Sequence, residues 1–252
     1  MALLQPISMQ GNVFNIKDKD KYKKALKLLN ESINGCPIFI ADNLITWNRN
    51  LSFLRDDYFL DYLNNKNNND VVKSTIWRLY ILLYFAEIAA KIDGDFMELG
   101  VLQGNTVAEV IKKVDFEKLQ KKYYLYDLFE WKEGDKHPPL NALKDPLLYE
   151  KVCDRFTNSS FIQIIKGSIP QSFNEVFPKK ICFAHIDMNQ AEPEGSALER
   201  ILPKLSKNGI IIFDDYGWWS YSEQKQHLDS IVKRFNLKIL ELPTGQGLLI
   251  NS

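Results

Sequence analysis

The chain has 252 residues, of which 45% are hydrophobic and 25% are charged. These proportions are typical of a folded globular protein and exclude disordered, collagen-like and coiled-coil classes. Its 32 Lys and Arg residues balance 32 Asp and Glu residues, so no overall positive field favours nucleic acid or an anionic membrane as a partner. The three cysteines, Cys36, Cys153 and Cys182, form no CxxC pair, which is typical of reduced thiols in a cytoplasmic protein.

The composition changes near residue 70, after an asparagine-rich tract at residues 64–69. Before it, apolar residues at helical spacing predict helices at residues 20–32 and 50–63, and no strand period is present. Asparagine-rich tracts form turns rather than regular structure. We therefore expect residues 1–69 to form a separate helical segment and residues 70–252 to form the main domain.

After this boundary the sequence predicts one long helix at residues 71–92, followed by alternating strands and helices. The expected strands occupy residues 96–99, 123–128, 161–166, 181–186, 209–214, 237–242 and 247–250. Short apolar strands separated by helices are typical of an α/β fold with a mostly parallel sheet covered on both faces. Only residues 243–246 separate the last two strands, which predicts a hairpin and one antiparallel strand.

Ligands of an open parallel sheet bind beyond the carboxyl ends of its strands. The first strand ends in Glu98 and leads through Gly100 and Gly104 into a helix, but these glycines do not match the GxGxxG dinucleotide fingerprint. The second strand ends in Asp127, 29 residues after Glu98 (127 − 98). Asp127 is a candidate for binding two ribose hydroxyls, and the alternative is a solvated aspartate at a strand end.

The later strand ends carry further candidates. Gly167 and Ser168 follow the third strand, where they either meet an adenine edge or form an ordinary loop. Asp187 follows the fourth strand, and Asp214 and Asp215 follow the fifth. Neighbouring strands are about 5 Å apart, so the three carboxylates are expected to reach one Mg²⁺, Mn²⁺ or Ca²⁺ ion rather than zinc. Turn-forming aspartates are the alternative.

Two other residue types near these strand ends were weighed. His185 shares the face of Asp187 by strand alternation, and we expect a buried core histidine, so no histidine is assigned to catalysis. Trp218, Trp219 and Tyr221 follow the fifth strand. They either form an aromatic wall for a substrate or pack the loop.

Four segments, taken together and in order, resemble the metal-dependent O-methyltransferases of the macrocin and aminocoumarin type. They are Gly94 to Val101 (GDFMELGV), Tyr126 to Glu130 (YDLFE), His185 to Asp187 (HID) and Asp214 to Gly217 (DDYG). The resemblance runs from about residue 70 to the end. The residues from Asp42 to Asp56 also resemble that family's N-terminal segment, which folds over the cofactor pocket as a lid.

The resemblance implies a Rossmann-like class I methyltransferase fold of seven strands and an S-adenosylmethionine (SAM) cofactor. It implies cofactor contacts from Glu98, Gly100, Val101, Gly104, Thr106, Asp127, Leu128, Gly167, Ser168 and Asp187. It also implies Mg²⁺ or Mn²⁺ at Asp187, Asp214 and Asp215, with Asp187 as a candidate base, and substrate contacts from Arg49, Tyr216 and Trp218. The expected acceptor is a hydroxyl of a sugar, a polyol or a sugar-containing natural product, and the resemblance makes a homo-oligomer (dimer), paired through the N-terminal helices, a further expectation.

The chain departs from the family pattern at two places. Asn189 and Gln190 stand where an acid and a tyrosine are usual, and residues 102–105 read LQGN where WRGG is usual. An asparagine can ligate a cation through its carbonyl oxygen but adds no charge. The alternatives are therefore a SAM- or nucleotide-binding module without catalysis and, from the shared Rossmann pattern, a nicotinamide-dependent oxidoreductase.

Overall fold

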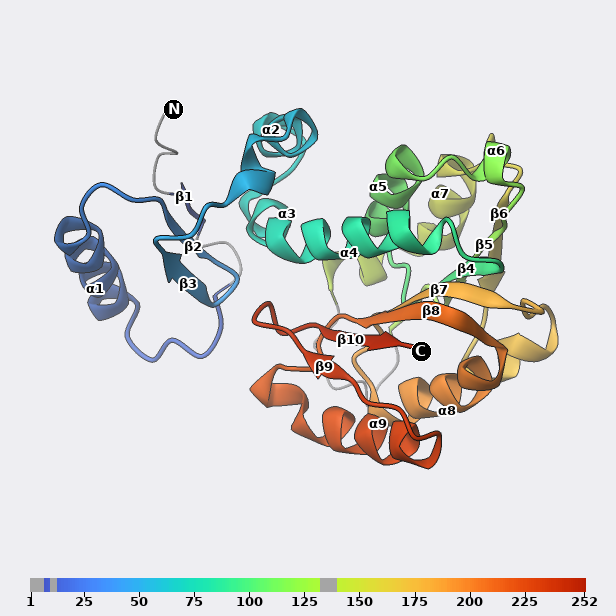
Figure 1. Cartoon of the computed structure of the whole chain (residues 1–252). Coiled ribbons are helices and arrows are strands. Elements are labelled where there is room, and N and C mark those ends of the chain that lie inside the picture. Colours follow the sequence, from blue (N-terminus) through green and yellow to red (C-terminus); the bar gives the residue numbers. More distant parts are fainter. Residues whose placement is uncertain (1–6, 10–12, 132–139) are drawn as a thin grey trace. The chain divides into compact units, whose positions relative to one another are not determined.

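The computed structural model describes residues 7–9, 13–131 and 140–252 (Figure 1). The chain divides into two compact units, Met1–Tyr80 and Ile81–Ser252, and the division falls within helix α4 (Ile76–Ala89). The boundary at residue 70 that composition indicates lies at the start of the short helix α3 (Asp70–Ser74). In the described part of the chain, no helix is long and apolar enough to cross a bilayer.

The C-terminal unit contains a seven-stranded sheet with the order β6-β5-β4-β7-β8-β10-β9. Five neighbouring strands are parallel, whereas β10 runs antiparallel to both β8 and β9. The strands are β4 (Asp95–Leu99), β5 (Tyr123–Asp127), β6 (Ile162–Lys166), β7 (Ile181–Ile186), β8 (Leu205–Phe213), β9 (Leu240–Glu241) and β10 (Gly247–Ile250). The predicted α/β, Rossmann-like fold with a terminal antiparallel hairpin is confirmed.

Helices cover both faces of this sheet, with α5 and α7 on one face and α8 and α9 on the other (Figure 1). They are α5 (Asn105–Lys113), α6 (Phe116–Leu119), α7 (Leu148–Arg155), α8 (Ala191–Ile201) and α9 (Ser222–Arg234). Single 3₁₀ turns lie between them: η2 (Asn141–Lys144), η3 (Gln171–Asn174), η4 (Leu202–Lys204) and η5 (Trp219–Tyr221).

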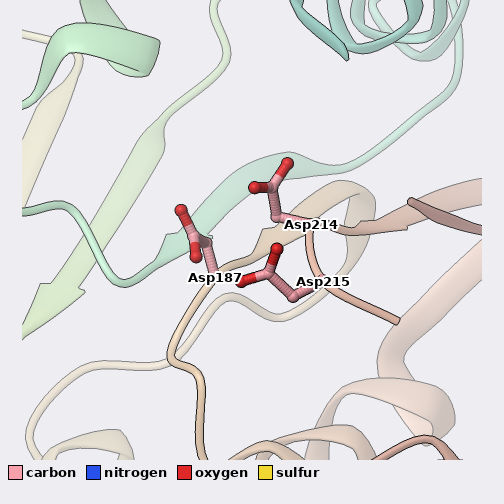
Figure 2. Close-up of side chains that lie close together, drawn as sticks. All are labelled: Asp187, Asp214 and Asp215. Carbon is pink, nitrogen blue, oxygen red and sulfur yellow. The ribbon is translucent and has the colours of Figure 1, made fainter. Parts of the chain in front are cut away.

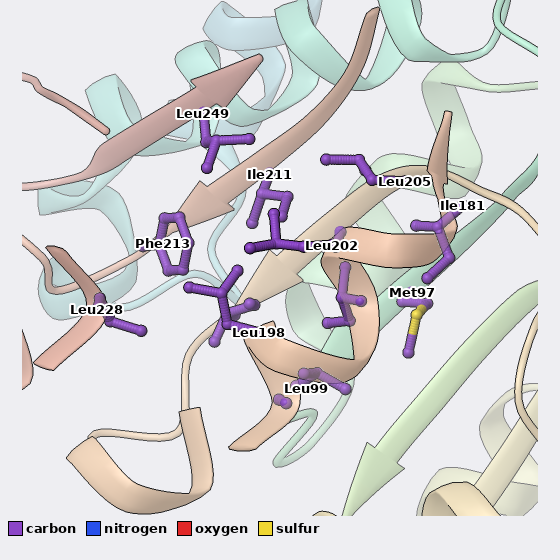
Figure 3. Packing of buried hydrophobic residues seen from close by; sticks show 14 of the residues in the cluster. Met97, Leu99, Ile181, Leu198, Leu202, Leu205, Ile211, Phe213, Leu228 and Leu249 are labelled. Atoms are coloured by element: carbon purple, nitrogen blue, oxygen red, sulfur yellow. The ribbon is translucent and has the colours of Figure 1, made fainter. Parts of the chain in front are cut away.

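The main core fills the space between the sheet and α8 and α9 (Figure 3). All six residues of β7 are buried, as expected for a central parallel strand with both faces covered. Leu198 of α8 and Leu228 of α9 are each 0% exposed and pack against Ile211 and Phe213 of β8. This packing makes the central strands a rigid base for the residues that follow them.

The N-terminal unit contains a three-stranded sheet, which the sequence did not predict. Its strands are β1 (Ile7–Ser8), β2 (Ile38–Ala41) and β3 (Leu44–Trp47), with β2 in the centre. The expectation of a purely helical segment is therefore wrong. The strands have two to four residues, and all four residues of β2 are buried, so the sequence shows no strand period long enough to mark them. Asp42 and Asn43 both have positive φ, 53° and 54°, which forms the tight turn between β2 and β3.

The helices of this unit are interrupted where side chains compete for backbone groups. The helix expected at residues 20–32 is α1 (Lys19–Ser32). The one expected at 50–63 divides into η1 (Ser52–Arg55) and α2 (Asp57–Asn64), because the Asp56 carboxylate caps α2. The one expected at 71–92 divides at Thr75. There the hydroxyls of Ser74 and Thr75 donate to the carbonyls of Val71 and Val72, three residues earlier.

Two strand predictions in the C-terminal unit need adjustment. β8 begins at Leu205, four residues before the expected start at residue 209 (209 − 205 = 4), because Leu205 pairs with Ile181 before the register shifts. The strand expected at 237–242 shrinks to β9, because the side chains of Leu237 and Ile239 pack against the core while the backbone remains unpaired with the sheet.

Candidate active site

The carboxyl ends of three central strands lie level with one another. Leu99 of β4 pairs with Ile186 of β7, and Ile186 pairs with Phe213 of β8. One residue further, the Asp187 amide donates to the Leu99 carbonyl (2.8 Å) and the Asp214 amide donates to the Ile186 carbonyl (2.9 Å). The register therefore brings the Gly100 turn, Asp187 and Asp214 to one place.

Asp187, Asp214 and Asp215 form a cluster at this edge (Figure 2). One oxygen from each carboxylate lies within 4.8 Å of the others, and all three residues are half-buried. Like charges at this spacing repel one another more strongly where water is partly excluded. Carboxylate oxygens are the donors that Mg²⁺ and Mn²⁺ prefer, so this donor set fits such an ion. The three side chains lie together as the sequence predicted.

Side-chain amides approach two of these carboxylates. The Asn189 amide donates to Asp187 Oδ1 (3.4 Å), and the Gln246 amide donates to Asp214 Oδ1 (3.4 Å). Gln246 is 1% exposed, and its own carbonyl oxygen accepts from the Thr244 hydroxyl (3.0 Å). Sequence reasoning missed Gln246, because a glutamine in a hairpin turn carries no signal for a site on another strand.

A buried histidine lies between two carboxylates. The Nε2 atom of His185 is 3.9 Å from Asp214 Oδ1, and its Nδ1 atom is 3.7 Å from Glu98 Oε2. These are ion-pair distances rather than hydrogen bonds. Burial alone would lower the pKa of His185, but the carboxylates of Asp214 and Glu98 raise it to about 10. The expected burial of His185 is confirmed, whereas the sequence did not predict its two charged neighbours.

Glu98, which is expected near the methionine part of the cofactor, is almost fully buried. Its side chain is 1% exposed, and its Oε2 atom accepts from the Tyr123 hydroxyl (2.6 Å). Burial, followed by the charge of Glu98 and this hydrogen bond, raises the pKa of Tyr123 well above its ordinary value. Glu98, His185 and Asp214 thus continue a row of polar groups that begins at Tyr123.

Glu194 of α8 is a fourth acid near the cluster, and the sequence analysis did not single it out. Its Oε1 atom accepts from the backbone amides of Met188 (3.1 Å) and Asn189 (3.0 Å), and its Oε2 atom accepts from Gln224 (2.8 Å). Burial raises the pKa of Glu194 well above its ordinary value, and the charges of Asp187 and Asp215 contribute in the same direction. Glu194 therefore shapes the loop that follows β7.

The turn after β4 is built around Asp127. Its Oδ2 atom accepts from the backbone amides of Val101 and Leu102, both at 2.7 Å, and its Oδ1 atom accepts from the Phe129 amide at 2.6 Å. Gly100 has φ 89°, and a Cβ there would lie 1.9 Å from the Asp187 carbonyl oxygen. Only glycine can occupy this position without moving the backbone.

Arg155 of α7 holds the other side of the same turn. Its guanidinium donates to the Gln103 carbonyl (2.6 Å) and to the Asn105 side-chain oxygen (2.8 Å). Gly104 has φ 71°, and a Cβ there would lie 2.6 Å from the Phe156 ring. The turn formed by residues 102–105 is therefore held by a cation from α7, which the local sequence did not reveal.

The remaining cofactor candidates lie on neighbouring strand ends. Thr106 is half-buried in the first turn of α5, and Leu128 is half-buried directly after β5. The Gly167 amide donates to the Asp127 carbonyl (3.0 Å), which ties the end of β6 to that of β5. Ser168 is exposed, and its hydroxyl donates to the Gln171 side chain (3.2 Å).

The three residues expected at the substrate differ in their surroundings. Arg49 is exposed in the N-terminal unit. Tyr216 is 1% exposed, and its hydroxyl contacts Asp229 (2.5 Å) and Lys225 (2.7 Å), so its ring packs in the core. Trp218 is half-buried against Gly245. The neighbouring Trp219 is 88% exposed, which makes it the aromatic residue of this loop that is open to solvent.

Residues 97–216 match a family model described as a methyltransferase domain. This segment contains the Gly100 turn, Asp127 and the whole aspartate cluster. The chain is a SAM-dependent methyltransferase. This assignment does not support the nicotinamide-dependent alternative. No curated protein matches the sequence of this methyltransferase.

Solved structures share the fold of the methyltransferase at low sequence identity. The O-methyltransferase NovP has a TM-score of 0.57 at 16% identity, covering 73% of this chain and 82% of its own. A structure of the calicheamicin methyltransferase CalS11 has a TM-score of 0.58 at 14% identity, covering 99% of each chain. An S-adenosylhomocysteine-bound methyltransferase of Podospora anserina, PaMTH1, has a TM-score of 0.51 at 11% identity, covering 96% of this chain and 99% of its own.

Proposed function

We propose that the methyltransferase is an O-methyltransferase of the macrocin and aminocoumarin type, which uses Mg²⁺ or Mn²⁺ to methylate a hydroxyl of a sugar or sugar-containing natural product. The observation that carries the proposal is the aspartate cluster, whose oxygens lie within 4.8 Å of one another at the strand ends beside the Gly100 turn. Two neighbours of the same fold are described as NovP, an O-methyltransferase, and CalS11, a TDP-rhamnose 3'-O-methyltransferase.

The reaction is a single displacement. The bond between the methyl carbon and the sulfonium sulfur of SAM breaks, a bond from that carbon to the acceptor oxygen forms, and the hydroxyl proton passes to a base. Catalysis therefore needs alignment of the two reactants and a lower proton affinity of the acceptor oxygen. Asp187 is our candidate base, because it directly follows β7 and borders the Gly100 turn.

The cation would be held by Asp187, Asp214 and Asp215. When bound, it supplies positive charge that lowers the pKa of a hydroxyl beside it. The chain contributes three carboxylates on a rigid sheet edge, and Glu194 and Gln246 hold the surrounding loops. Asn189 carries no charge, so the negative charge of the proposed ligands comes from the three aspartates alone.

The cofactor would lie along the ends of β4, β5 and β6. The Gly100 turn leaves backbone close to the site, and we assign the methionine part of SAM to this turn and to Glu98, Val101, Gly104 and Thr106. We assign the ribose to Asp127 and Leu128, and the adenine to Gly167 and Ser168. The Asp127 carboxylate already accepts three backbone amides, so it also shapes the turn.

The acceptor side is assigned to the loop after β8. Trp219 is 88% exposed and lies four residues beyond Asp215 (219 − 215 = 4). An exposed indole can stack on the apolar face of a sugar or on a flat ring attached to it. We place Trp219, rather than the buried Tyr216, at the acceptor.

Transfer of a labelled methyl group tests the proposal. Labelled SAM is incubated with dTDP-rhamnose and with a panel of free and glycosidic sugars, and binding of S-adenosylhomocysteine is measured in parallel by calorimetry. We expect cofactor binding with or without Mg²⁺, and transfer that EDTA abolishes and Mg²⁺ restores. Transfer that is insensitive to EDTA would contradict the cation's role. Cofactor binding without transfer to any acceptor would favour the binding module, which Asn189 and Gln190 first suggested.

A further inference from the structure

Asp214 is contacted at one oxygen by side chains from two other parts of the fold. Gln246, from the hairpin between β9 and β10, donates its amide to Oδ1 at 3.4 Å. His185 of β7 places its Nε2 atom 3.9 Å from the same oxygen. Neither residue belongs to the aspartate cluster, and both are almost fully buried, at 1% and 3% exposure. A carboxylate approached from two directions by rigid groups has little freedom to rotate.

The amide of Gln246 is oriented by its own surroundings. The Thr244 hydroxyl, itself buried, donates to the Gln246 Oε1 atom at 3.0 Å, which orients the amide so that its nitrogen faces Asp214. The backbone is fixed as well, because the Leu242 amide donates to the Gln246 carbonyl (2.8 Å) and the Gly245 carbonyl accepts from Gly217 (2.7 Å). The hairpin therefore places the side-chain amide of Gln246 within hydrogen-bonding distance of Asp214 Oδ1.

His185 is held on its other side by the interior of the sheet. His185 pairs with Glu98 across β7 and β4, so the two side chains share a face. The Nδ1 atom lies 3.7 Å from Glu98 Oε2, and that oxygen accepts from the Tyr123 hydroxyl at 2.6 Å. Glu98, held by Tyr123, thus lies beside the inner nitrogen of the His185 ring, and the row crosses β5, β4, β7 and the end of β8.

We propose that His185 and Gln246 are positioning residues that hold the Asp214 carboxylate in the orientation that binds the divalent cation. The inference rests on the proposed function and adds two residues that contact neither cofactor nor acceptor in it. Groups that orient a metal ligand commonly contribute 10- to 100-fold to metal affinity. Asp214 therefore depends on the terminal hairpin and on the sheet interior for its role.

The test compares Gln246→Met and His185→Gln with the wild type. Methionine keeps the size of glutamine without its donor, and glutamine at position 185 keeps a polar group that can reach one carboxylate. Mn²⁺ binding is measured by electron paramagnetic resonance, S-adenosylhomocysteine binding by calorimetry, and methyl transfer as a function of Mn²⁺ concentration. Gln226→Met and His227→Gln are matched controls on α9, at an exposed and a half-buried position.

We expect about 10-fold weaker Mn²⁺ binding in Gln246→Met and about 10- to 100-fold weaker binding in His185→Gln. Cofactor affinity should remain within about twofold, and saturating Mn²⁺ should restore kcat, because the ligands themselves are intact. A purely structural role would lower cofactor affinity and kcat together, and metal would not rescue it. That pattern overturns the inference, as does unchanged Mn²⁺ affinity in both variants.

The wild type separates this inference from the proposed function. If the wild type binds no Mn²⁺, the cation-dependent function fails and the inference fails with it. If the wild type binds Mn²⁺ and both variants bind it equally well, only the inference fails. Tyr123→Phe supplies a graded check, because it removes the hydroxyl at the far end of the row. We expect a smaller loss of Mn²⁺ affinity there than in His185→Gln.

Discussion

Aspartates lie at two places along the carboxyl edge of the sheet, and their surroundings are opposite in kind. Beside β5, the Asp127 carboxylate accepts three backbone amides at 2.6 to 2.7 Å. Beside β7 and β8, the carboxylates of Asp187, Asp214 and Asp215 approach one another within 4.8 Å. The first charge is stabilised by the chain's own donors. The second group concentrates negative charge, which a cation would offset.

This contrast separates two kinds of site acid. Asp127 is part of the backbone architecture of the cofactor turn, so its contribution to folding is present with or without ligands. The aspartate cluster is mutually repulsive, so its electrostatic cost should fall when a divalent ion is present. At the same edge of the sheet, one aspartate therefore organises a loop, and three others form the cluster that we propose binds a cation.

The largest expected effect is on turnover, from Asp214→Asn. Removing one of three charged ligands should lower Mg²⁺-dependent methyl transfer about 100-fold or more, since a catalytic cation contributes several kcal/mol. Affinity for S-adenosylhomocysteine, measured by calorimetry, should change less than about twofold. Asp154→Asn, at an exposed position of α7, is the matched control. If Asp214→Asn loses affinity for S-adenosylhomocysteine as strongly as it loses turnover, the proposed division between a cation site at the aspartate cluster and a cofactor site at Asp127 is wrong.

The reciprocal change, Asp127→Ala, should act on the cofactor side. It leaves the amides of Val101, Leu102 and Phe129 without their acceptor, so the turn should loosen. We expect a loss of about 2 kcal/mol or more in unfolding free energy, measured by urea denaturation, and weaker binding of S-adenosylhomocysteine. Mn²⁺ affinity should be retained. An unchanged denaturation midpoint would mean that these hydrogen bonds do not stabilise the folded chain.

The cluster's repulsion should also appear as a ligand-induced shift in stability. An ion that binds only the folded chain stabilises it by about 2.7 kcal/mol at a concentration of 100 times its Kd. Mg²⁺ should therefore raise the Tm of the wild type and leave that of Asp214→Asn nearly unchanged in a thermal-shift assay. Na⁺ at equal ionic strength controls for screening. A Tm that rises equally in both proteins would place the ion elsewhere.

A smaller effect should come from Glu194, which should make the unfolding free energy depend on pH. Burial raises the pKa of Glu194 in the folded chain, so between its ordinary and raised pKa the folded state binds more protons than the unfolded state. Stability should therefore fall as pH rises through this window. Glu194→Gln should flatten the slope of unfolding free energy against pH in EDTA-containing buffer. An unchanged slope would mean that Glu194 ionises in the folded chain as it does in the unfolded one.

The smallest expected effect on folding comes from Trp219→Ala. The indole is 88% exposed, so its removal should change the unfolding free energy by less than about 0.5 kcal/mol. If the acceptor stacks on it, KM for the acceptor should rise while kcat and cofactor affinity stay close to wild type. Trp218→Ala is the contrasting variant, because Trp218 packs against Gly245 and its loss should destabilise the fold.

Sequence patterns predicted the main fold well because the strands of the C-terminal unit are short, mostly apolar segments separated by helical patterns. The residues of β7, for example, are all buried, and their composition alone indicates a central strand. The N-terminal strands were missed because they have only two to four residues, and the central one, β2, is buried throughout and shows no alternation. The helix break at Thr75 was missed because it depends on which carbonyls the hydroxyls of Ser74 and Thr75 reach.

For the site, the sequence by itself determined which acids end the strands, because parallel strands bring their carboxyl ends to one edge in any such sheet. It could not determine the partners of those acids. Gln246, His185 and Arg155 reach their contacts across strands or from another helix. Such contacts depend on register, rotamer and burial, which local sequence does not encode. Tertiary packing alone decided that Tyr216 is buried, that Trp219 is exposed, and that Asp127 shapes the turn it was expected only to border.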